Sequence, residues 1–277
     1  MRLACAGLAL CVFMSTLPAT ADAQGKLDAR YEASISGIPV GKGSWIIDIG
    51  DETYSAAASG ASSGLMKAFA GGSGTGAVTG RVVAGVLVPT KYTAGVTMSK
   101  KTEAIHINLA DGNVKESGIE PAPSVDPSRI PVSADQLHGV TDPMTAALLR
   151  AAASGDVMAP GNCKTATSIF DGRMRYDLKF DFKRVEIMKS ETYAKGYRGP
   201  ALVCSIAFAP ISGYVPDRAA IKYLAAHRNM EVWLAPITGT RVLVPVRVTI
   251  PTPLGVAMLE ATEFVSVVSP PRVARTQ

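Results

Sequence analysis

The chain has 277 residues, a hydrophobic fraction of 47% and a formal net charge of +5 at pH 7. This length suits one large domain or two small ones. The charge lacks the dense Lys/Arg clusters that mark nucleic-acid-binding proteins, so we expect no nucleic-acid partner. Diffuse positive charge suits peripheral contact with an anionic membrane surface, and it suits a plain soluble protein equally well.

The first 23 residues have the pattern of a cleavable signal peptide. A positively charged start is followed by an almost uninterrupted apolar run at residues 3–17. Ala21 and Ala23 then supply the small-x-small pattern that signal peptidase needs, so we expect cleavage before Gln24. The apolar run is shorter than the roughly 20 residues that a membrane-spanning helix requires. We therefore predict export to the periplasm and a mature chain of residues 24–277.

Export decides how the four cysteines are interpreted. Cys5 and Cys11 fall within the predicted signal peptide, which leaves Cys163 and Cys204 in the mature chain. Two cysteines in an oxidising compartment most often pair, so we expect a disulfide between them. Two unpaired buried thiols are the alternative. Neither cysteine belongs to a C-x-x-C motif, which argues against a thiol oxidoreductase.

Alternation of polar and apolar residues dominates the mature chain and predicts strands with one wet face and one buried face. In the first half of the chain, we predict strands at residues 27–36, 43–49, 52–58 and 105–109. Glycine-containing turns are predicted between them, at residues 37–41, 50–51 and 111–112.

Two further stretches have no such alternation. Residues 60–80 are rich in glycine, serine and alanine, and we expect them to be flexible. Residues 120–133 carry four prolines and predict a long crossing loop. A single curled sheet needs such a crossing, so the loop is not interpreted as a domain linker.

Helix signals are few. Asp142 and Pro143 supply a capping residue and a proline in the first turn, which predicts a helix over residues 144–153. A second candidate at residues 215–227 is either a short helix or an irregular crossover.

The clearest strand covers residues 173–183, where charged residues at odd positions alternate with apolar residues at even positions. The dipeptide at residues 171–172, Asp-Gly, predicts a hairpin with a preceding strand. Pro245 interrupts a run of alternating valines and predicts an edge strand or a bulge there. The strands predicted in this half cover residues 165–170, 173–183, 200–209, 242–250 and 258–268.

About a dozen strands separated by turns predict a mainly β protein. We expect one β-rich domain over residues 24–277, built as a large antiparallel curled sheet or incomplete β-barrel with one or two short helices. Bridged Cα atoms lie only about 4.4–6.8 Å apart. Joining Cys163 to Cys204 in a later strand therefore requires a curled sheet or a loop folded back across it.

One motif resembles a catalytic sequence. Residues 60–64 fit G-x-S-x-G, the nucleophile elbow of α/β-hydrolases, with Ser62 in the nucleophile position. That elbow needs a strand before it, a helix after it and parallel-sheet surroundings, which an antiparallel β chain does not offer. We interpret it as a loop of small residues and expect no catalytic residue.

The glycine-rich residues 71–76 lack the lysine and the Ser/Thr of a phosphate-binding loop, and we expect a flexible hairpin or a pivot between strands. His106, His138 and His227 are far apart in the sequence and have no metal-ligand spacing. His106 is expected to face solvent. We therefore expect no metal and no cofactor.

Several short motifs give the chain a resemblance to a known family. They are Gly37-Ile38-Pro39-Val40-Gly41, Val88-Pro89-Thr90-Lys91-Tyr92, Thr141-Asp142-Pro143, Asp171-Gly172-Arg173-Met174-Arg175-Tyr176, Glu231-Val232-Trp233-Leu234, Val244-Pro245-Val246 and Leu254-Gly255. With them the chain resembles the Gram-negative periplasmic family catalogued as domain of unknown function 3108. The resemblance covers nearly all of the mature chain and implies export and a β-rich fold, but it implies no reaction.

Two functional hypotheses follow. The first is a non-enzymatic envelope protein that binds an envelope partner or an apolar ligand and supports envelope integrity. Within it, a lipid carrier predicts an open apolar cavity, whereas a scaffold predicts that the helix fills the cavity. The second is a hydrolase or another enzyme whose site is assembled beyond what the sequence displays.

Overall fold

The computed structural model describes residues 24–64, 67, 71–99, 101–124 and 126–269. The predicted cleavage site lies at the border of this region. Ala21 and Ala23 are outside the described residues, and Gln24 is the first residue inside them.

Seven strands in the first half of the chain form a meander in which each strand pairs with the next. They are β1 (Gly25–Ile35), β2 (Ile38–Ile49), β3 (Thr53–Ser62), β4 (Gly72–Val83), β5 (Val86–Met98), β6 (Lys101–Ala110) and β7 (Asn113–Glu120). Two-residue turns join several of these pairs. At Ser36 and Gly37, both backbone φ angles are positive, which is the geometry of a type I′ hairpin turn.

The second half contains seven more strands, two α-helices and two 3₁₀ turns. They are η1 (Ala134–Leu137), α2 (Pro143–Ala146), β8 (Leu149–Arg150), η2 (Pro160–Cys163), β9 (Thr165–Phe170), β10 (Arg175–Met188), β11 (Gly199–Ser212), α3 (Ala219–Ala226), β12 (Met230–Pro236), β13 (Val242–Thr252) and β14 (Gly255–Val268). Among the described residues, no helix is long and apolar enough to cross a membrane.

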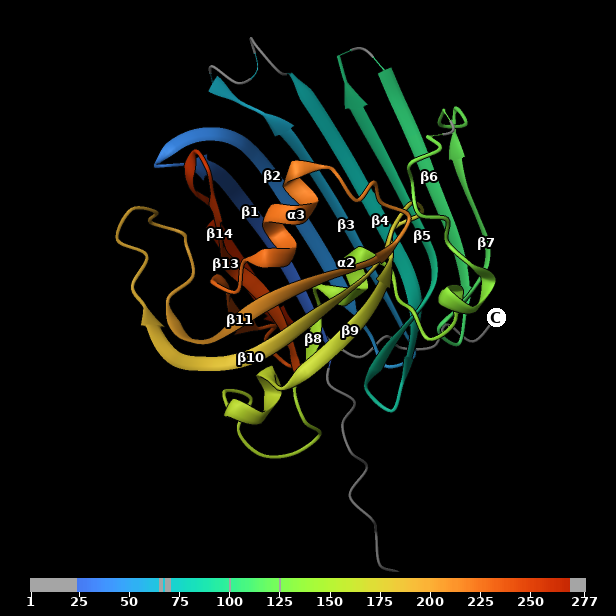
Figure 1. The fold of residues 1–277 in the computed structure, drawn as a ribbon. Helices are drawn as coiled ribbons and strands as arrows, with labels where there is room; N and C mark the ends of the chain where they lie inside the picture. The colour runs from blue at the N-terminus through green and yellow to red at the C-terminus, as the bar shows by residue number, and fades with distance from the viewer. Residues whose placement is uncertain (1–23, 65–66, 68–70, 100, 125, 270–277) are drawn as a thin grey trace, which may run out of the picture.

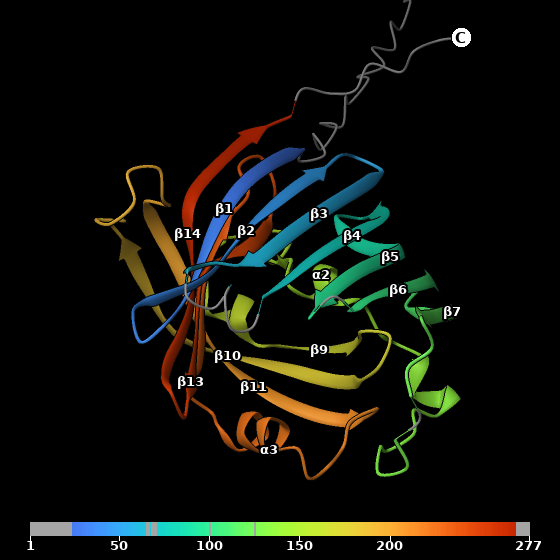
Figure 2. The same cartoon turned by 90° about the horizontal axis from the view of Figure 1, so that it is seen from above.

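All strands belong to one antiparallel sheet that curls around itself without closing (Figures 1 and 2). Its strand order is β7-β6-β5-β4-β3-β2-β1-β14-β13-β12-β11-β10-β9, with the short β8 paired to β13. The first strand therefore pairs with the last, and β7 and β9 are the two edges. The predicted mainly β fold, an incomplete barrel, is confirmed.

One extended segment bridges the gap between the two edges. The Val140 N–H donates to the Gly112 carbonyl at 2.8 Å, on the β6–β7 turn. The Thr141 N–H donates to Ser168 at 2.9 Å, and the Phe170 N–H donates back to Thr141 at 3.0 Å, both on β9. These bonds occupy part of the free edge of β9, so the sheet is held in its curled form without a continuous ladder.

The predicted helix after the proline-rich loop is shorter than expected. Asp142 caps it, as predicted, by accepting hydrogen bonds from Met144 N at 2.9 Å and Thr145 N at 3.0 Å. The helix ends at Ala146 instead of continuing to residue 153, because Leu149 and the residue after it pair with β13 as β8. Sheet pairing overrides the helix preference of an alanine-rich segment. The second candidate does contain a helix, α3, which packs against β11.

The glycine-rich stretch at residues 60–80 was predicted to be flexible, and for most of it this prediction is wrong. Its beginning belongs to β3 and its end to β4. Both strands pair with neighbours on both sides, with one register shift, between Thr79 and Gly80 in the pairing of β4 with β5. Residues 71–76 are thus mainly the start of β4, rather than a hairpin or a pivot. Partners on both sides hold a strand whose own β propensity is low.

Pro245 marks a bulge inside the sheet, one of the two alternatives predicted for it. Between β12 and β13 the register shifts, so that Val246 has no opposite partner, and β13 lies between β12 and β14 rather than at an edge. The strands around this bulge are buried on both faces. On β11, Val203 packs into the larger apolar core and Leu202 into a smaller one.

The expected cysteine pair forms a disulfide. Cys163 and Cys204 have Cα atoms 5.7 Å apart, and both side chains are fully buried in the smaller core. Cys163 ends η2, which folds back across β10 and β11 and so brings it to the strand that carries Cys204. The sequence predicted a curled sheet or a folded-back loop for this bridge, and the structure contains both.

Replacing both cysteines by alanine should lower the free energy of unfolding by about 4 kcal/mol, because the bridge closes a loop with a sequence separation of 41. Urea unfolding of the oxidised protein and of the Cys163→Ala/Cys204→Ala variant, both beginning at Gln24, measures this difference. A loss below about 1 kcal/mol would contradict the expected role of the bridge.

Candidate functional site

Cross-strand register arranges the inner face of β1–β5 in rows of opposing residues. One row is fully packed and forms the centre of the larger core: Leu27, Ile47, Ala56, Val78 and Tyr92. Every member is at most 8% exposed. Because side chains alternate between the faces of a strand, residues two or four positions away from this row point to the same side.

The row four positions further along is almost empty of side chains. It consists of Tyr31, Gly43, Gly60, Gly74 and Val96, and we call it the glycine row. Three glycines opposite one another on adjacent strands leave open space above the backbone. The result is a cavity of about 890 Å³, which we call the small-residue cavity.

The remaining walls of the small-residue cavity are apolar and aromatic. Trp45 of β2 and Tyr92 of β5 contribute rings, while Pro245, Val248 and Leu259 contribute from β13 and β14. The Tyr31 hydroxyl donates to the Pro245 carbonyl at 2.9 Å and ties the two walls together. Among the described residues that line the cavity, Lys42 is the one charged residue.

Helix α2 closes the inner end of the cavity. It lies between β4, β5 and β9, inside the curl of the sheet (Figure 2). The Tyr54 hydroxyl and Thr145 Oγ1 form a buried hydrogen bond of 2.7 Å. Gly76 lets the helix pack closely against β4, because a Cβ at this position would lie 3.0 Å from Met144 Sδ. The residue after the helix, Ala147, lines the cavity.

A buried carboxyl group sits at the start of this helix. Asp142 is fully buried, and burial raises the pKa of its side chain above the ordinary value despite the hydrogen bonds it accepts from Thr145 and Met144. Burial, together with the nearby Asp142 and Asp171, also raises the pKa of Tyr92 to about 12. The raised pKa reflects the burial of this ring at the inner end of the cavity, in keeping with an apolar lining.

The Asp142→Asn variant should keep the helix cap, since asparagine also caps helices, and should remove the cost of burying a carboxylate. An acid whose pKa is raised on folding binds more protons in the folded state, so its contribution to stability is lost as pH rises from its ordinary pKa of 3.8 toward the folded pKa. We expect the variant to gain stability relative to the wild type as pH increases. Urea unfolding between about pH 4 and about pH 8 measures this, and parallel pH profiles of the two proteins would contradict it.

Ser62 of the G-x-S-x-G motif lies in the last position of the antiparallel strand β3. Its hydroxyl donates to the Gly72 carbonyl at 3.1 Å and accepts from the Gly72 N–H at 2.8 Å. It lines the small-residue cavity, but none of the described residues around that cavity is His, Asp or Glu. The motif therefore has no acid or base partner in the cavity.

The three histidines are not brought together. His138 contacts Asn113 at 2.8 Å, and His227 contacts the carbonyl of its own helix residue Tyr223 at 2.7 Å. His106, expected to face solvent, is half-buried with its ring over Gly118. Within the described ranges, no group of three His, Cys, Asp or Glu residues has metal-binding geometry.

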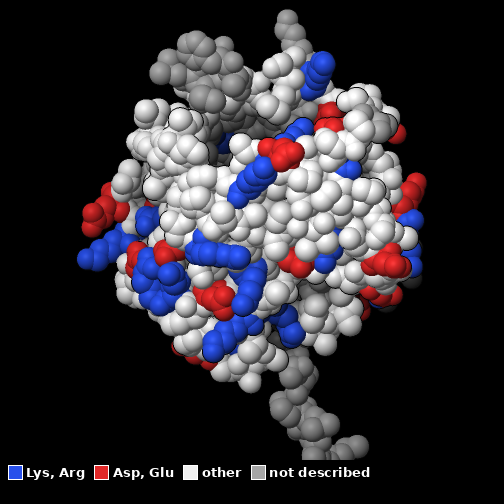
Figure 3. Space-filling model, viewed as in Figure 1, with Lys and Arg blue, Asp and Glu red and all other residues white. Residues whose placement is uncertain are grey.

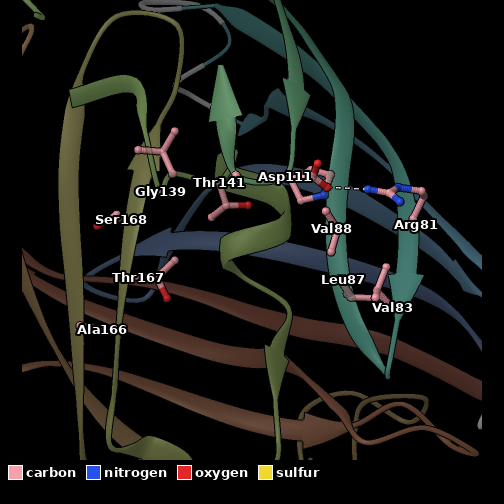
Figure 4. A pocket seen from close by; sticks show the side chains of 13 residues that line it. Arg81, Val83, Leu87, Val88, Asp111, Gly139, Thr141, Ala166, Thr167 and Ser168 are labelled. Carbon is pink, nitrogen blue, oxygen red and sulfur yellow. Dashed lines mark hydrogen bonds and ion pairs between the residues drawn. The ribbon is translucent and has the colours of Figure 1, made fainter. Parts of the chain in front are cut away.

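A second, smaller pocket of about 500 Å³ lies in the gap between the sheet edges (Figure 4). We call it the gap pocket. Its walls come from β4, β5, β9 and the bridging segment, and Thr141 and Thr167 are among its lining residues. Arg81 and Asp111 form an ion pair of 2.7 Å at one side of the pocket. Its mixed lining and smaller volume make it a weaker candidate than the small-residue cavity.

Charged groups lie mainly on the outer surface. In Figure 3, lysine and arginine side chains lie next to aspartate and glutamate side chains in the lower half of the face shown. A group of charged side chains surrounds Trp233, whose ring lies 5.4 Å from the Arg184 guanidinium and 5.5 Å from that of Arg247. Arg184 pairs with Glu186 at 2.9 Å, and Arg247 pairs with Glu260. We interpret this group as structural, because each guanidinium already has a carboxylate partner.

The sequence contained a signal for the glycine row that motif reasoning missed. Gly72, Gly74 and Gly76 alternate with Ser73 and Thr75, which is the period of a strand with small residues on one face. The pattern was interpreted as flexibility, because glycine is common in loops. Only the partner strands reveal that the small positions face one another.

Comparisons with known proteins place the chain as follows. The family model described as "Protein of unknown function (DUF3108)" matches residues 30–262. No curated protein matches the sequence. Among solved structures, the chain is similar to a β-barrel-like protein of domain of unknown function DUF1849 from Brucella abortus, with 9% identity and a TM-score of 0.47. The match covers 89% of this chain and 98% of that one.

Proposed function

The chain belongs to the DUF3108 family of proteins of unknown function, and we propose that it is a non-enzymatic periplasmic protein that binds an apolar ligand. The ligand occupies the small-residue cavity, and an acyl chain of an envelope lipid is the chemistry that fits best. A role in envelope integrity follows from holding or delivering such a lipid.

The observation that carries this proposal is the cavity itself. Its volume of about 890 Å³ lies within the range of roughly 300–1,000 Å³ that is typical of small-molecule sites. Its walls offer rings, methyl groups and glycine backbone, and almost no charge. Each methylene removed from water contributes about 0.8 kcal/mol, so about ten of them contribute about 8 kcal/mol before the cost of ordering the chain.

The position of α2 favours a carrier over a scaffold. A scaffold predicts that the helix fills the interior of the sheet. Here α2 packs against the end that holds the packed row, through Tyr54 and Thr145, and the glycine row beyond it remains uncovered. The helix thus lies beside the cavity, which it reaches through Ala147, the residue after its last turn, instead of occupying it.

Native mass spectrometry of protein purified gently from periplasm tests the proposal. We expect a second charge-state series whose mass exceeds that of the chain starting at Gln24 by the mass of a lipid or fatty acid. Delipidation and re-addition of a fatty acid should restore the series. A protein that is always free of ligand, before and after fatty acid is added, would overturn the proposal.

Filling the cavity should abolish ligand binding without unfolding the sheet. At Gly60 and Gly74, a Cβ would meet only backbone carbonyl oxygens at 3.6 Å and 3.5 Å, which are ordinary contacts. The Gly60→Leu/Gly74→Leu variant should therefore fold, fill the cavity with two leucine side chains, and bind fatty acid at least about tenfold more weakly, a loss of about 1.4 kcal/mol or more.

The matched control is Ala57→Leu, which adds the same side chain on the exposed face of the same strand. A brominated fatty acid reports binding by quenching Trp45, which lines the cavity, and Trp45→Phe should remove that signal. Equal affinity of the cavity-filled variant and the control would contradict the assigned site.

A hydrolase remains the alternative from another class, and Ser62 is the cavity residue that the G-x-S-x-G motif puts in the nucleophile position. Incubating the same protein with a fluorophosphonate probe, and with ester and glycoside substrates, tests it. Labelling of Ser62, lost in Ser62→Ala, would favour the enzyme.

A further inference from the structure

Strands β2, β3, β4 and β5 and the β13–β14 turn end together at the open end of the small-residue cavity. On the front sheet, Gly41 of β2 opposes Ser62 of β3, the Ser62 hydroxyl bonds Gly72 of β4, and Gly72 opposes Met98 of β5. The β13–β14 turn joins the same end, because the Ser36 hydroxyl donates to the Leu254 carbonyl at 3.0 Å. The cavity lining reaches these strand ends.

The tips at this end carry exposed apolar side chains. Leu254 is 77% exposed, Met98 62%, Ile38 61% and Val256 49%. Three of these four are among the four most exposed large apolar residues in the described part of the chain, with Ile187 as the other one. Single exposed apolar residues are ordinary, but several on adjacent turns around a cavity mark an interaction surface.

The charge at the same end is positive. Lys42 and Lys101 are exposed there, and the sequence from residue 53 to residue 102 contains no aspartate or glutamate. Residues 33–47 and 248–259 contain none either. The acid at this end of the sheet edge is Glu120, the last residue of β7, which is separated from β5 by β6.

The carboxylates just below these tips have partners. Glu103 pairs with Arg173 at 2.5 Å, and Glu32 accepts a hydrogen bond from the Tyr193 hydroxyl at 2.9 Å. Lys42 lies 3.9 Å from Glu32, a long contact that leaves its side chain 71% exposed. The end of the sheet therefore presents apolar tips and lysines. Glu103 and Glu32 have partners, and Glu120 is exposed on the edge strand β7.

We propose that these tips form a membrane-docking rim, composed of Ile38, Met98, Leu254 and Val256 with Lys42 and Lys101, that binds a bilayer surface containing anionic lipids. Apolar side chains enter the boundary between headgroups and acyl chains, and the lysines lie at the level of the lipid phosphates. Docked in this way, the open end of the cavity faces the acyl region. The transfer of a lipid between bilayer and cavity rests on the proposed function, whereas the docking surface stands on the rim residues alone.

Flotation with vesicles tests the rim. We expect the wild-type protein, beginning at Gln24, to float with phosphatidylcholine vesicles that contain about one third phosphatidylglycerol, and to float far less with phosphatidylcholine alone or at high salt. Ile38→Glu/Leu254→Glu should bind at least about tenfold more weakly. Lys42→Gln and Lys101→Gln should each weaken binding about fivefold and reduce its salt dependence.

Val86→Glu is the matched control, because Val86 is exposed and apolar and lies at the opposite end of β5 from Met98. It should bind vesicles like the wild type. Equal loss in the control and in the rim variant, or a wild-type protein that does not bind anionic vesicles, would overturn the proposal. A concentration-dependent dimer that Leu254→Glu abolishes, without vesicle binding, would overturn it and assign the tips to self-association.

Ligand binding measured without vesicles separates the two proposals. Trp45 quenching by brominated fatty acid should be unchanged in Ile38→Glu/Leu254→Glu, because neither side chain lines the cavity. Quenching without vesicle binding in the wild type would end the docking proposal and leave the ligand site standing. Vesicle binding without quenching would end the ligand-site proposal and leave the docking rim standing.

Discussion

Cross-strand register is the constraint on which the cavity depends. From β2 through β4 the pairing runs without a shift, so that Gly43, Gly60 and Gly74 face one another on the inner side of the sheet. Side chains alternate with a period of two, so a slip of one residue in β3 would turn Ala57 and Ser59 inward and move Gly60 out of the glycine row. The packed row prevents such a slip, because it would also expose Ala56 and its buried neighbours.

The two ends of the curled sheet carry inward-facing side chains of different size. At one end, large side chains meet α2, and the helix is fixed by Asp142, by the Tyr54–Thr145 hydrogen bond and by close packing at Gly76. At the other end, glycine replaces those side chains. Glycine in a strand costs conformational entropy and has no side chain to pack, so a row of three glycines lowers the stability of the sheet. The proposed apolar-ligand site gives a physical reason for this loss of stability.

The back of the molecule supplies the stiffness that an open sheet lacks. Strands β11–β13 are buried on both faces, the disulfide of Cys163 and Cys204 holds η2 against β11, and the bridging segment at Val140 links the two sheet edges. The disulfide, η2 and the bridging segment are not among the described residues that line the small-residue cavity, whereas β13 contributes Pro245 and Val248 to its wall. The cavity can therefore remain open while the fold around it is held elsewhere.

The sequence by itself determined the elements that local chemistry dictates. Alternation identified β10, and the turn dipeptides located hairpins. Asp142 and Pro143 marked the start of α2, and Pro245 marked a position that had to be either a bulge or an edge strand. Tertiary structure decided the rest. It ended α2 early, because Leu149 pairs with Leu243, in the part of β13 that β14 does not pair with. It also placed residues 60–62 and 72–80 in strands, because partners on both sides supplied the hydrogen bonds. The candidate site was out of reach from the sequence, since a cavity is made by glycines from three strands that become neighbours only when the sheet is paired.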